Sequence, residues 1–210
     1  MKDTEFGIPS NNWKQIVQLL ELGRSNEVFC ILDAEIVMAS DNFFKSAAYE
    51  KLGAIYRTLN KPEKAIEAFQ EAIKLHGSLN TPALTRIYLA LGLTYKETGN
   101  VQKALEIYEM GINKLFDRAI KLIADEEGCF SSTNDKGERV LNVSPKAFER
   151  IRELCKMDVT FAALRNNMGT CFVELGDYDT ARQMFSESID FTPDGLSYDH
   201  PRYNLSCIDS

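Results

Sequence analysis

Side chains that commonly carry catalysis or bind metals are few in this sequence and lie far apart. The 210 residues include only two histidines, His76 and His200, and neither has a cysteine or a carboxylate at the spacing of a metal ligand or a catalytic pair. The run from Asp135 to Glu138 lacks the alternating acidic positions of a calcium loop. No glycine-rich phosphate loop follows a strand, and we find no convincing strand at all. We therefore expect no catalytic residue, no metal site and no cofactor, and predict that the chain is not an enzyme.

The cysteines do not suggest a redox or zinc site either. They are odd in number, have no close pair and stand mostly at apolar helix positions, which favours buried, reduced thiols. The five are Cys30, Cys129, Cys155, Cys171 and Cys207. Cys129 lies in a polar segment, so it is the thiol that we expect to react with a thiol reagent.

Three stretches of the chain share one spacing of small and aromatic residues. Each has an apolar residue and a glycine, an aromatic three residues later, and then an alanine, an aromatic and a small residue. Because 3.6 residues per turn bring such positions to one face, each stretch predicts two amphipathic helices that fit large side chains over small ones. The sets are Leu52, Gly53, Tyr56, Ala65, Phe69 and Ala72; Leu91, Gly92, Tyr95, Ala104, Tyr108 and Gly111; and Met168, Gly169, Phe172, Ala181, Phe185 and Ser188, followed by Pro193.

The turns between the two helices of each stretch agree with this pattern. They read TLNKPEKA, ETGNVQKA and ELGDYDTA, and each places Asn, Gly or Asp where one helix ends and the next begins. In all these features the chain resembles the tetratricopeptide repeat (TPR) family, over residues 47–75, 85–114 and 162–193. The resemblance implies an all-α fold, a right-handed superhelical solenoid of antiparallel helix pairs.

The spacing between repeats is irregular. Gly53 and Gly92 are 39 residues apart, but Gly92 and Gly169 are 77 residues apart. We interpret the long interval as two overlong helices, the second of repeat two and the first of repeat three, which pair as an extended helical hairpin with a polar loop at its tip. The alternative is one degenerate repeat with the same loop as its inter-helix turn.

These observations predict a single TPR-like domain over residues 1–210. The degenerate N-terminal helix pair and the truncated C-terminal helix would cover the two ends of the repeat array. The predicted parts are a degenerate helix pair at 10–40, repeats at 46–77, 85–114 and 162–195, a helical insertion at 115–161 with its polar loop at about 128–144, and a capping helix at 196–210.

Composition limits the kinds of partner. The chain is 44% hydrophobic and 26% charged, which is ordinary for a globular protein with one continuous core. A formal charge of -7 argues against nucleic acid, which requires basic patches. No signal peptide and no apolar run of membrane-spanning length occurs, so we expect a cytoplasmic protein without a membrane partner.

The resemblance also implies where a ligand would bind. In TPR proteins the first helix of each repeat lines a concave groove, and these faces here also include Ala54, Thr58, Val173 and Glu174. The predicted groove residues are Glu50, Arg57, Arg86, Leu89, Leu93, Lys96, Asn166 and Thr170. Arg57, Arg86 and Lys96 beside two leucines suit an acidic or C-terminal peptide with an apolar anchor. The competing interpretation is an ordinary solvated helix face, with the leucines packed under the N-terminal helices.

The predicted function is therefore a non-catalytic adaptor that binds a peptide or protein segment in its concave groove. The alternative is a structural subunit of a homo-oligomer or of a larger complex, held by the helical hairpin. In both cases the partner is a protein.

Overall fold

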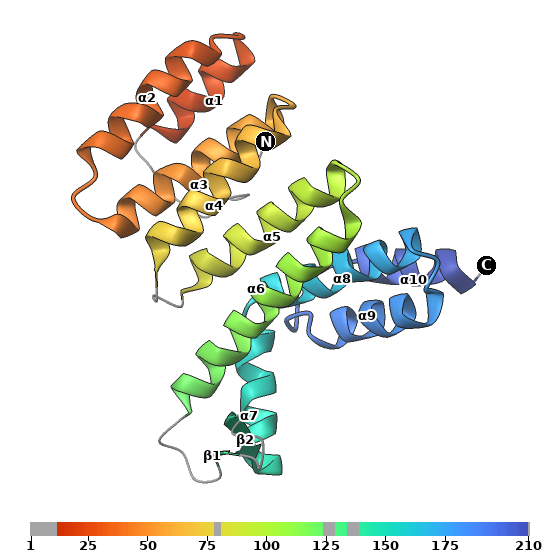
Figure 1. Cartoon of the computed structure of the whole chain (residues 1–210). Helices are drawn as coiled ribbons and strands as arrows, with labels where there is room; N and C mark the ends of the chain where they lie inside the picture. Colours follow the sequence, from red (N-terminus) through yellow and green to blue (C-terminus); the bar gives the residue numbers. More distant parts are fainter. Residues whose placement is uncertain (1–11, 78–80, 124–128, 134–138, 210) are drawn as a thin grey trace. The chain divides into compact units, whose positions relative to one another are not determined.

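The computed structural model describes residues 12–77, 81–123, 129–133 and 139–209, without the side chains of 129–133, 139–142 and 209. Contacts between Cα atoms divide the chain into two compact units, residues 1–76 and 77–210, and each is described by itself. The described residues form ten helices and two short strands (Figure 1). The all-α fold class is confirmed, whereas the single-domain organisation stays a prediction.

The first unit consists of two helix pairs. Helices α1 (Trp13–Glu21) and α2 (Ser25–Met38) precede α3 (Asn42–Thr58) and α4 (Pro62–His76). Its core is small and apolar: Ile16, Leu19, Val28, Leu32, Leu52, Ile55 and Ala68 are buried together.

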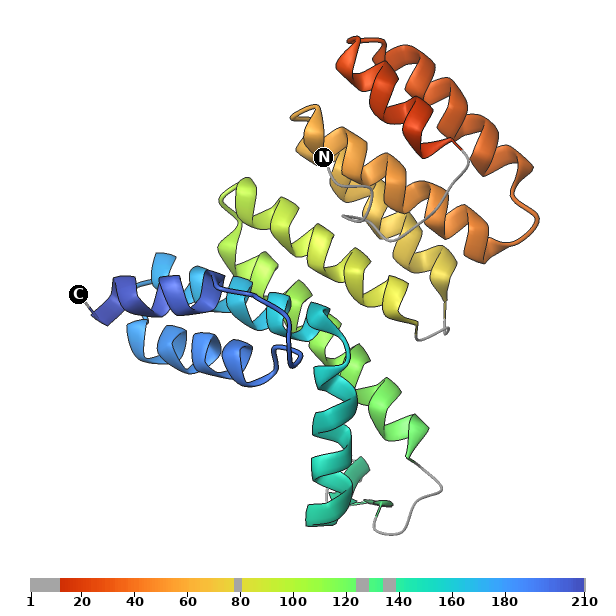
Figure 2. The same cartoon turned by 180° about the vertical axis from the view of Figure 1, so that it is seen from behind.

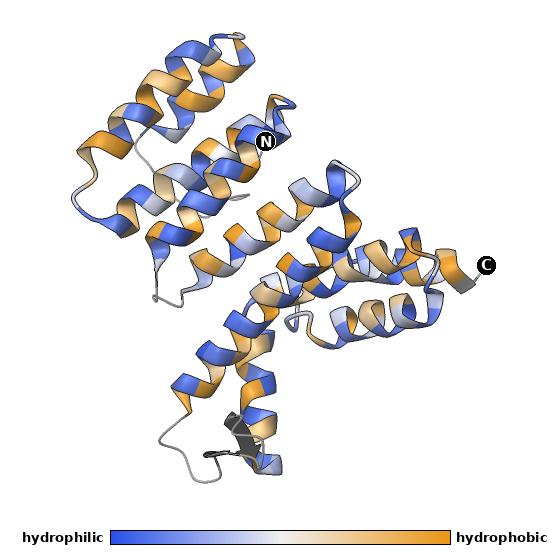
Figure 3. Cartoon of the chain, in the orientation of Figure 1, coloured by the Kyte–Doolittle hydropathy of each residue, from blue (hydrophilic) through white to orange (hydrophobic). Residues whose placement is uncertain are grey.

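The second unit contains the other two repeats and the segment between them. Its elements are α5 (Pro82–Glu97), α6 (Val101–Leu122), β1 (Cys129–Thr133), β2 (Arg139–Val143), α7 (Pro145–Lys156), α8 (Val159–Glu174), α9 (Tyr178–Asp190) and α10 (His200–Asp209). Helix α7 lies beside the second half of α6, with the strand pair at its far end (Figure 2). We call residues 113–158 the arm. Figure 3 shows that polar and apolar residues alternate around α6 and α9, as expected of helices with one covered face.

The arm differs from the predicted helical hairpin in two ways. Helix α6 is long, with 22 residues, as predicted. The next helix, however, is interrupted at Met157 and Asp158, so α7 and α8 are two separate helices and not one overlong helix. The reason is an N-cap: the Asp158 carboxylate accepts a hydrogen bond from the Thr160 backbone N–H at 3.0 Å, which begins α8 afresh. The same carboxylate forms a 2.8 Å ion pair with Arg118 of α6.

The second difference is the strand pair, since the sequence had indicated no strand. β1 and β2 pair antiparallel, with Cys129 opposite Val143 and Thr133 opposite Arg139. Each strand has only five residues, and β1 reads CFSST, too short and too polar for a clear alternation of apolar side chains. The two strands therefore lie within the segment, about 128–144, that was predicted as a polar loop.

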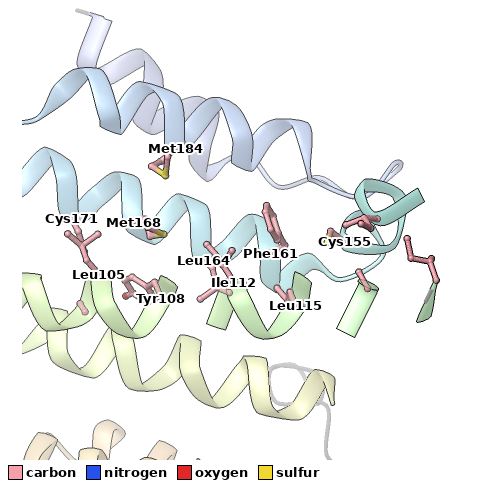
Figure 4. Packing of buried hydrophobic residues seen from close by; sticks show 14 of the residues in the cluster. Leu105, Tyr108, Ile112, Leu115, Cys155, Phe161, Leu164, Met168, Cys171 and Met184 are labelled. Carbon is pink, nitrogen blue, oxygen red and sulfur yellow. The ribbon is translucent and has the colours of Figure 1, made fainter. Parts of the chain in front are cut away.

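Inside each repeat an aromatic ring lies in close contact with a glycine. A Cβ atom added at Gly169 would lie 2.5 Å from Phe185, one at Gly53 would lie 2.7 Å from Phe69, and one at Gly92 would overlap Tyr108. All three rings are fully buried. Figure 4 shows the core around Tyr108, where side chains of α6 face Leu164 and Met168 of α8. The predicted fit of large over small residues is confirmed.

The inter-helix turns have a shared backbone conformation. Asn60, Gly99 and Gly176 follow the first helix of the three repeats with φ angles of 54°, 76° and 79°. These left-handed conformations end a helix and allow the chain to reverse, as the turn sequences predicted.

The four described thiols fall into two classes. Cys155 and Cys171 are buried, and Cys30 and Cys207 are exposed, so the expectation that most cysteines are buried is wrong for half of them. Burial raises the pKa of Cys155 and that of Cys171 to about 11. The side chain of Cys129, predicted to be reactive, lies outside the described residues.

This division predicts the pattern of thiol modification. At pH 8 iodoacetamide should alkylate Cys30 and Cys207 within minutes, and peptide mapping by mass spectrometry should find Cys155 and Cys171 unmodified, because only a thiolate reacts. Because the pKa of both thiols is raised in the folded protein, folding favours their protonated form. Their contribution to the free energy of unfolding should be fully present below pH 9.0, the ordinary thiol pKa, and should be lost as the pH rises to about 11. Equal labelling of all four thiols in native protein would contradict the burial.

Candidate functional site

A hollow of the second unit lies between the C-terminal half of α8, the start of α9 and α10. Its volume is about 850 Å³, which is in the range of binding sites for peptides and small ligands. We call it the C-terminal groove. It is lined by Thr170, Val173, Glu174, Gly176, Asp177, Tyr178, Asp179, Arg182, Phe185, Asn204, Cys207 and Ile208.

Three helices position these side chains. The turn at Gly176 reverses the chain, and the Asp177 carboxylate caps α9 by accepting from the Thr180 backbone N–H at 3.1 Å. Helix α10 forms the third wall because Asn204 donates to the Asn166 side chain of α8 at 2.9 Å. The groove therefore depends on the C-terminal helix as well as on the third repeat.

The floor of the groove is apolar. Phe185 is fully buried there against Gly169, and Val173 and Ile208 are half-buried. Tyr178 stands at the edge with 52% of its surface exposed. An apolar floor with an aromatic edge offers a place for an apolar anchor of a bound segment.

The rim of the groove is acidic. Glu174, Asp177 and Asp179 line it with one arginine, Arg182, which forms a 3.2 Å ion pair with Asp179. Hydrogen bonds from the Thr180 side chain and backbone lower the pKa of Asp177, so its charge persists well below neutral pH. Residues 174–210 contain eight acidic residues and only two arginines, which gives this end of the chain most of the net charge of -7.

Two of the predicted groove residues, Lys96 and Thr170, meet in the second unit. The Lys96 ammonium donates to the Thr170 hydroxyl at 2.7 Å and lies 3.4 Å from the Glu174 carboxylate. Thr170 in turn donates to the Asn167 carbonyl at 2.8 Å. Lys96 therefore joins α5 to α8, and only 22% of its side chain is exposed.

The other predicted groove residues of the second unit are also wholly or partly buried against neighbouring side chains. Asn166 is buried, accepts from Asn204 and is hydrogen-bonded to Tyr198. Leu89 packs against the main core. Arg86 and Leu93 are half-buried on α5.

Two predicted residues, Glu50 and Arg57, belong to the first unit. Both lie on α3, where Glu50 is buried, with 5% of its surface exposed, and Arg57 is half-buried. That all eight predicted residues line one groove stays a prediction.

The residues that sequence analysis missed come from α9 and α10. Asp177, Tyr178 and Arg182 lie at the start of α9, and Asn204 and Cys207 belong to α10. The excess of acidic residues after position 173 was a visible signal of the rim's charge. The packing of α10 against α8 and α9 had no comparable signal.

A metal cluster and a membrane-spanning helix each have structural requirements that can be compared with the part of the chain that the structure describes. Within them, no group of three or more His, Cys, Asp or Glu side chains is arranged to hold a metal ion. None of their helices is long and apolar enough to cross a membrane.

Known proteins with a similar sequence contain TPR repeats. Residues 44–113 and 162–194 match tetratricopeptide repeats. A TPR repeat-containing protein of Methanocaldococcus jannaschii is 41% identical over 63 residues, which are 29% of this chain and 17% of that protein.

Solved structures give a weaker likeness. The TPR domain of Arabidopsis FLU aligns over 69% of this chain and 91% of its own, with 19% identity and a TM-score of 0.44. A putative kinesin light chain of Podospora anserina with TPR-like repeats aligns over 85% of this chain and 92% of its own, with 13% identity and a TM-score of 0.42. The helix pairs with their glycine–aromatic contacts and the matches at 44–113 and 162–194 together show that the chain belongs to the tetratricopeptide repeat family.

Proposed function

We propose that this protein is a non-catalytic adaptor that binds a segment of a partner protein in the C-terminal groove. The observation that carries the proposal is a hollow of about 850 Å³ with an apolar floor and an acidic rim. A TPR array typically serves as an interaction module or scaffold, and a groove of this kind provides it with a defined contact surface. Cytoplasmic location, predicted from the sequence, is part of the proposal.

The charge of the groove favours a basic segment as its ligand. The acidic ligand that the sequence suggested depended on Arg57, Arg86 and Lys96. Lys96 is engaged by Thr170 and Glu174, and the carboxylates on the rim would repel an acidic peptide. We therefore place a lysine or arginine side chain of the partner at the rim and an apolar side chain on the floor.

Charge reversal on the rim tests this proposal. We expect Glu174→Lys/Asp179→Lys to weaken binding of a fluorescent peptide of alternating lysine and leucine by about tenfold, because two attractive charges become repulsive. Fluorescence anisotropy at low salt would measure the affinity.

The matched control is Glu149→Lys/Glu153→Lys on α7, whose side chains are 64% and 65% exposed. This variant changes the net charge of the protein by the same amount as the rim reversal, but at positions away from the C-terminal groove. Equal weakening by both double variants would show that the peptide responds only to net charge and would contradict the groove.

A second candidate function is that of a structural subunit held by the arm. A hollow of about 390 Å³ lies between α6, α7 and the start of α8, and three apolar residues stand exposed around it. Leu122, Met157 and Val159 are 65%, 79% and 41% exposed. In that case Leu122→Gln/Met157→Gln should release a partner subunit in size-exclusion chromatography, whereas the rim reversal should not.

A further inference from the structure

The corner between α7 and α8 exposes an apolar side chain next to a lysine. Met157 follows the last residue of α7, Lys156, and 79% of its surface is exposed. In the described part of the chain, four exposed large apolar residues stand next to a lysine or arginine in the sequence, and Met157 is the most exposed of them. The others are Phe44, Leu122 and Tyr203, which are 57%, 65% and 69% exposed. We call residues 156–158 the α7–α8 junction.

The free charge of this junction is positive. Among the described residues, Lys156 forms no ion pair with a carboxylate. The acidic side chains near it in the sequence are already engaged, since Asp158 pairs with Arg118 at 2.8 Å and Glu153 with Arg150 at 2.9 Å. The junction therefore presents one uncompensated ammonium beside an exposed thioether side chain.

The helical part of the arm is basic, whereas the chain as a whole is acidic. Residues 113–123 and 145–158 contain seven lysines and arginines and four carboxylates, against a net charge of -7 for the protein. The acidic run 125–127 follows Leu122 directly and lies outside the described residues, so we assign the contact to the junction and not to the end of α6. The 12 residues of α7, about 18 Å, separate the junction from the strand pair.

The C-terminal groove of the same unit has the opposite charge. Its lining includes three carboxylates and one arginine. Asp177 is exposed and, within the described part of the chain, has no lysine or arginine paired with it. The floor contains the Phe185 ring, and the long, flexible side chain of methionine packs well against aromatic rings. The junction thus combines the basic and the apolar side chain that the groove is proposed to bind.

One copy of the chain cannot fill its own groove with its own junction. The junction precedes the first residue of α8, whereas the groove lies at the C-terminal half of the same helix (Figure 1). Helix α8 has 16 residues, about 24 Å, and holds the two surfaces apart. A contact between them must therefore join two molecules. Because it joins different surfaces, it is head-to-tail and leads to open chains or rings.

We propose that the C-terminal groove binds the α7–α8 junction of a second copy of this protein, with Met157 on the apolar floor and Lys156 at the acidic rim. This inference rests on the function proposed for the groove and names its partner. The contact uses opposite charges and one central apolar anchor. Since few side chains take part, we expect association to be weak and to depend on protein concentration.

Sedimentation velocity of the full chain tests the proposal with one variant of each surface. The groove variant is Glu174→Lys/Asp179→Lys, and the junction variant is Lys156→Gln/Met157→Gln. We expect the mean sedimentation coefficient of the wild type to rise with concentration and each variant alone to remain monomeric. An equimolar mixture of the two variants should form a dimer and nothing larger, because only one intact junction and one intact groove are then available to each pair.

The matched control is Lys103→Gln/Met110→Gln, which changes the same residue types on α6 outside both surfaces. The Lys103 side chain is 45% exposed and Met110 is 47% exposed. This variant should associate like the wild type. An excess of the lysine–leucine peptide should return the wild type to monomer, since it competes for the groove.

The outcomes separate this inference from the function proposed for the groove. A wild type that stays monomeric up to about 0.5 mM, while the rim still binds the lysine–leucine peptide, would overturn the inference and leave the function standing. Loss of peptide binding and of association together would overturn both. An assembly that only the junction variant dissolves would be a contact between two arms, and a mixture of the two variants that stays monomeric would also contradict the proposal.

Discussion

Replacing Gly92 by leucine is expected to destabilise the second unit by about 3 kcal/mol, since a larger side chain in a packed core forces neighbouring groups out of place. The ring of Tyr108 lies against Gly92 and is fully buried, so it has no open space to move into. Leucine favours the helix over glycine by about 1 kcal/mol, which offsets only part of the overlap. Urea unfolding followed by circular dichroism would measure the change.

Three further variants separate overlap from other causes. Lys103→Leu, at an exposed position of α6, should leave the midpoint of unfolding nearly unchanged. Gly92→Ala should be destabilising alone but better tolerated together with Tyr108→Leu, because the smaller side chain leaves room for the new methyl group. A stabilised Gly92→Leu variant would refute the contact between glycine and ring.

Asp158→Ala is expected to destabilise the second unit by about 2–4 kcal/mol, because it leaves the Arg118 charge without its partner and removes the cap of α8. The two side chains are only 14% and 18% exposed, so water replaces the lost interactions poorly. The same unfolding experiment applies.

The two roles of Asp158 can be measured separately. Asp158→Asn keeps an acceptor for the Thr160 N–H but removes the charge. Its free energy of unfolding should therefore lie between that of the wild type and that of Asp158→Ala. If Arg118→Met and Asp158→Ala were strictly additive in the double variant, the ion pair would have no energetic role.

The repeats could be predicted from the sequence because their contacts are local. Gly53 and Phe69, or Gly169 and Phe185, lie in adjacent helices joined by a short turn, so a fixed spacing is enough to bring them together. The left-handed turn residues, such as Gly99 and Gly176, are identified by the same rule. These features predicted the fold class correctly.

The arm was harder to predict because its structure depends on single residues. A continuous apolar pattern through residues 148–155 gave no sign that the helix would end, whereas Asp158 followed by Thr160 is a capping signal that was overlooked. The strand pair depends on backbone pairing between two five-residue segments and has almost no side-chain pattern.

The site was harder still, because it depends on contacts between distant segments. Lys96 bonds to Thr170, 74 positions away, and Asn166 bonds to Asn204, 38 positions away. A periodic pattern identifies the face of a helix but not which neighbour already occupies it. The predicted concave face therefore included residues with structural roles and omitted those that α9 and α10 contribute.

The central claim is that the C-terminal groove holds a partner segment, and photo-crosslinking in native cell extract tests it most directly. The photoreactive amino acid p-benzoylphenylalanine would replace Tyr178 at the groove in one protein and Met157 on the arm in another. We expect Tyr178 to crosslink to segments rich in lysine and arginine, and the Glu174→Lys/Asp179→Lys changes to abolish these products. Crosslinks only from position 157, or products at position 178 that survive the charge reversal, would contradict the assignment of the groove.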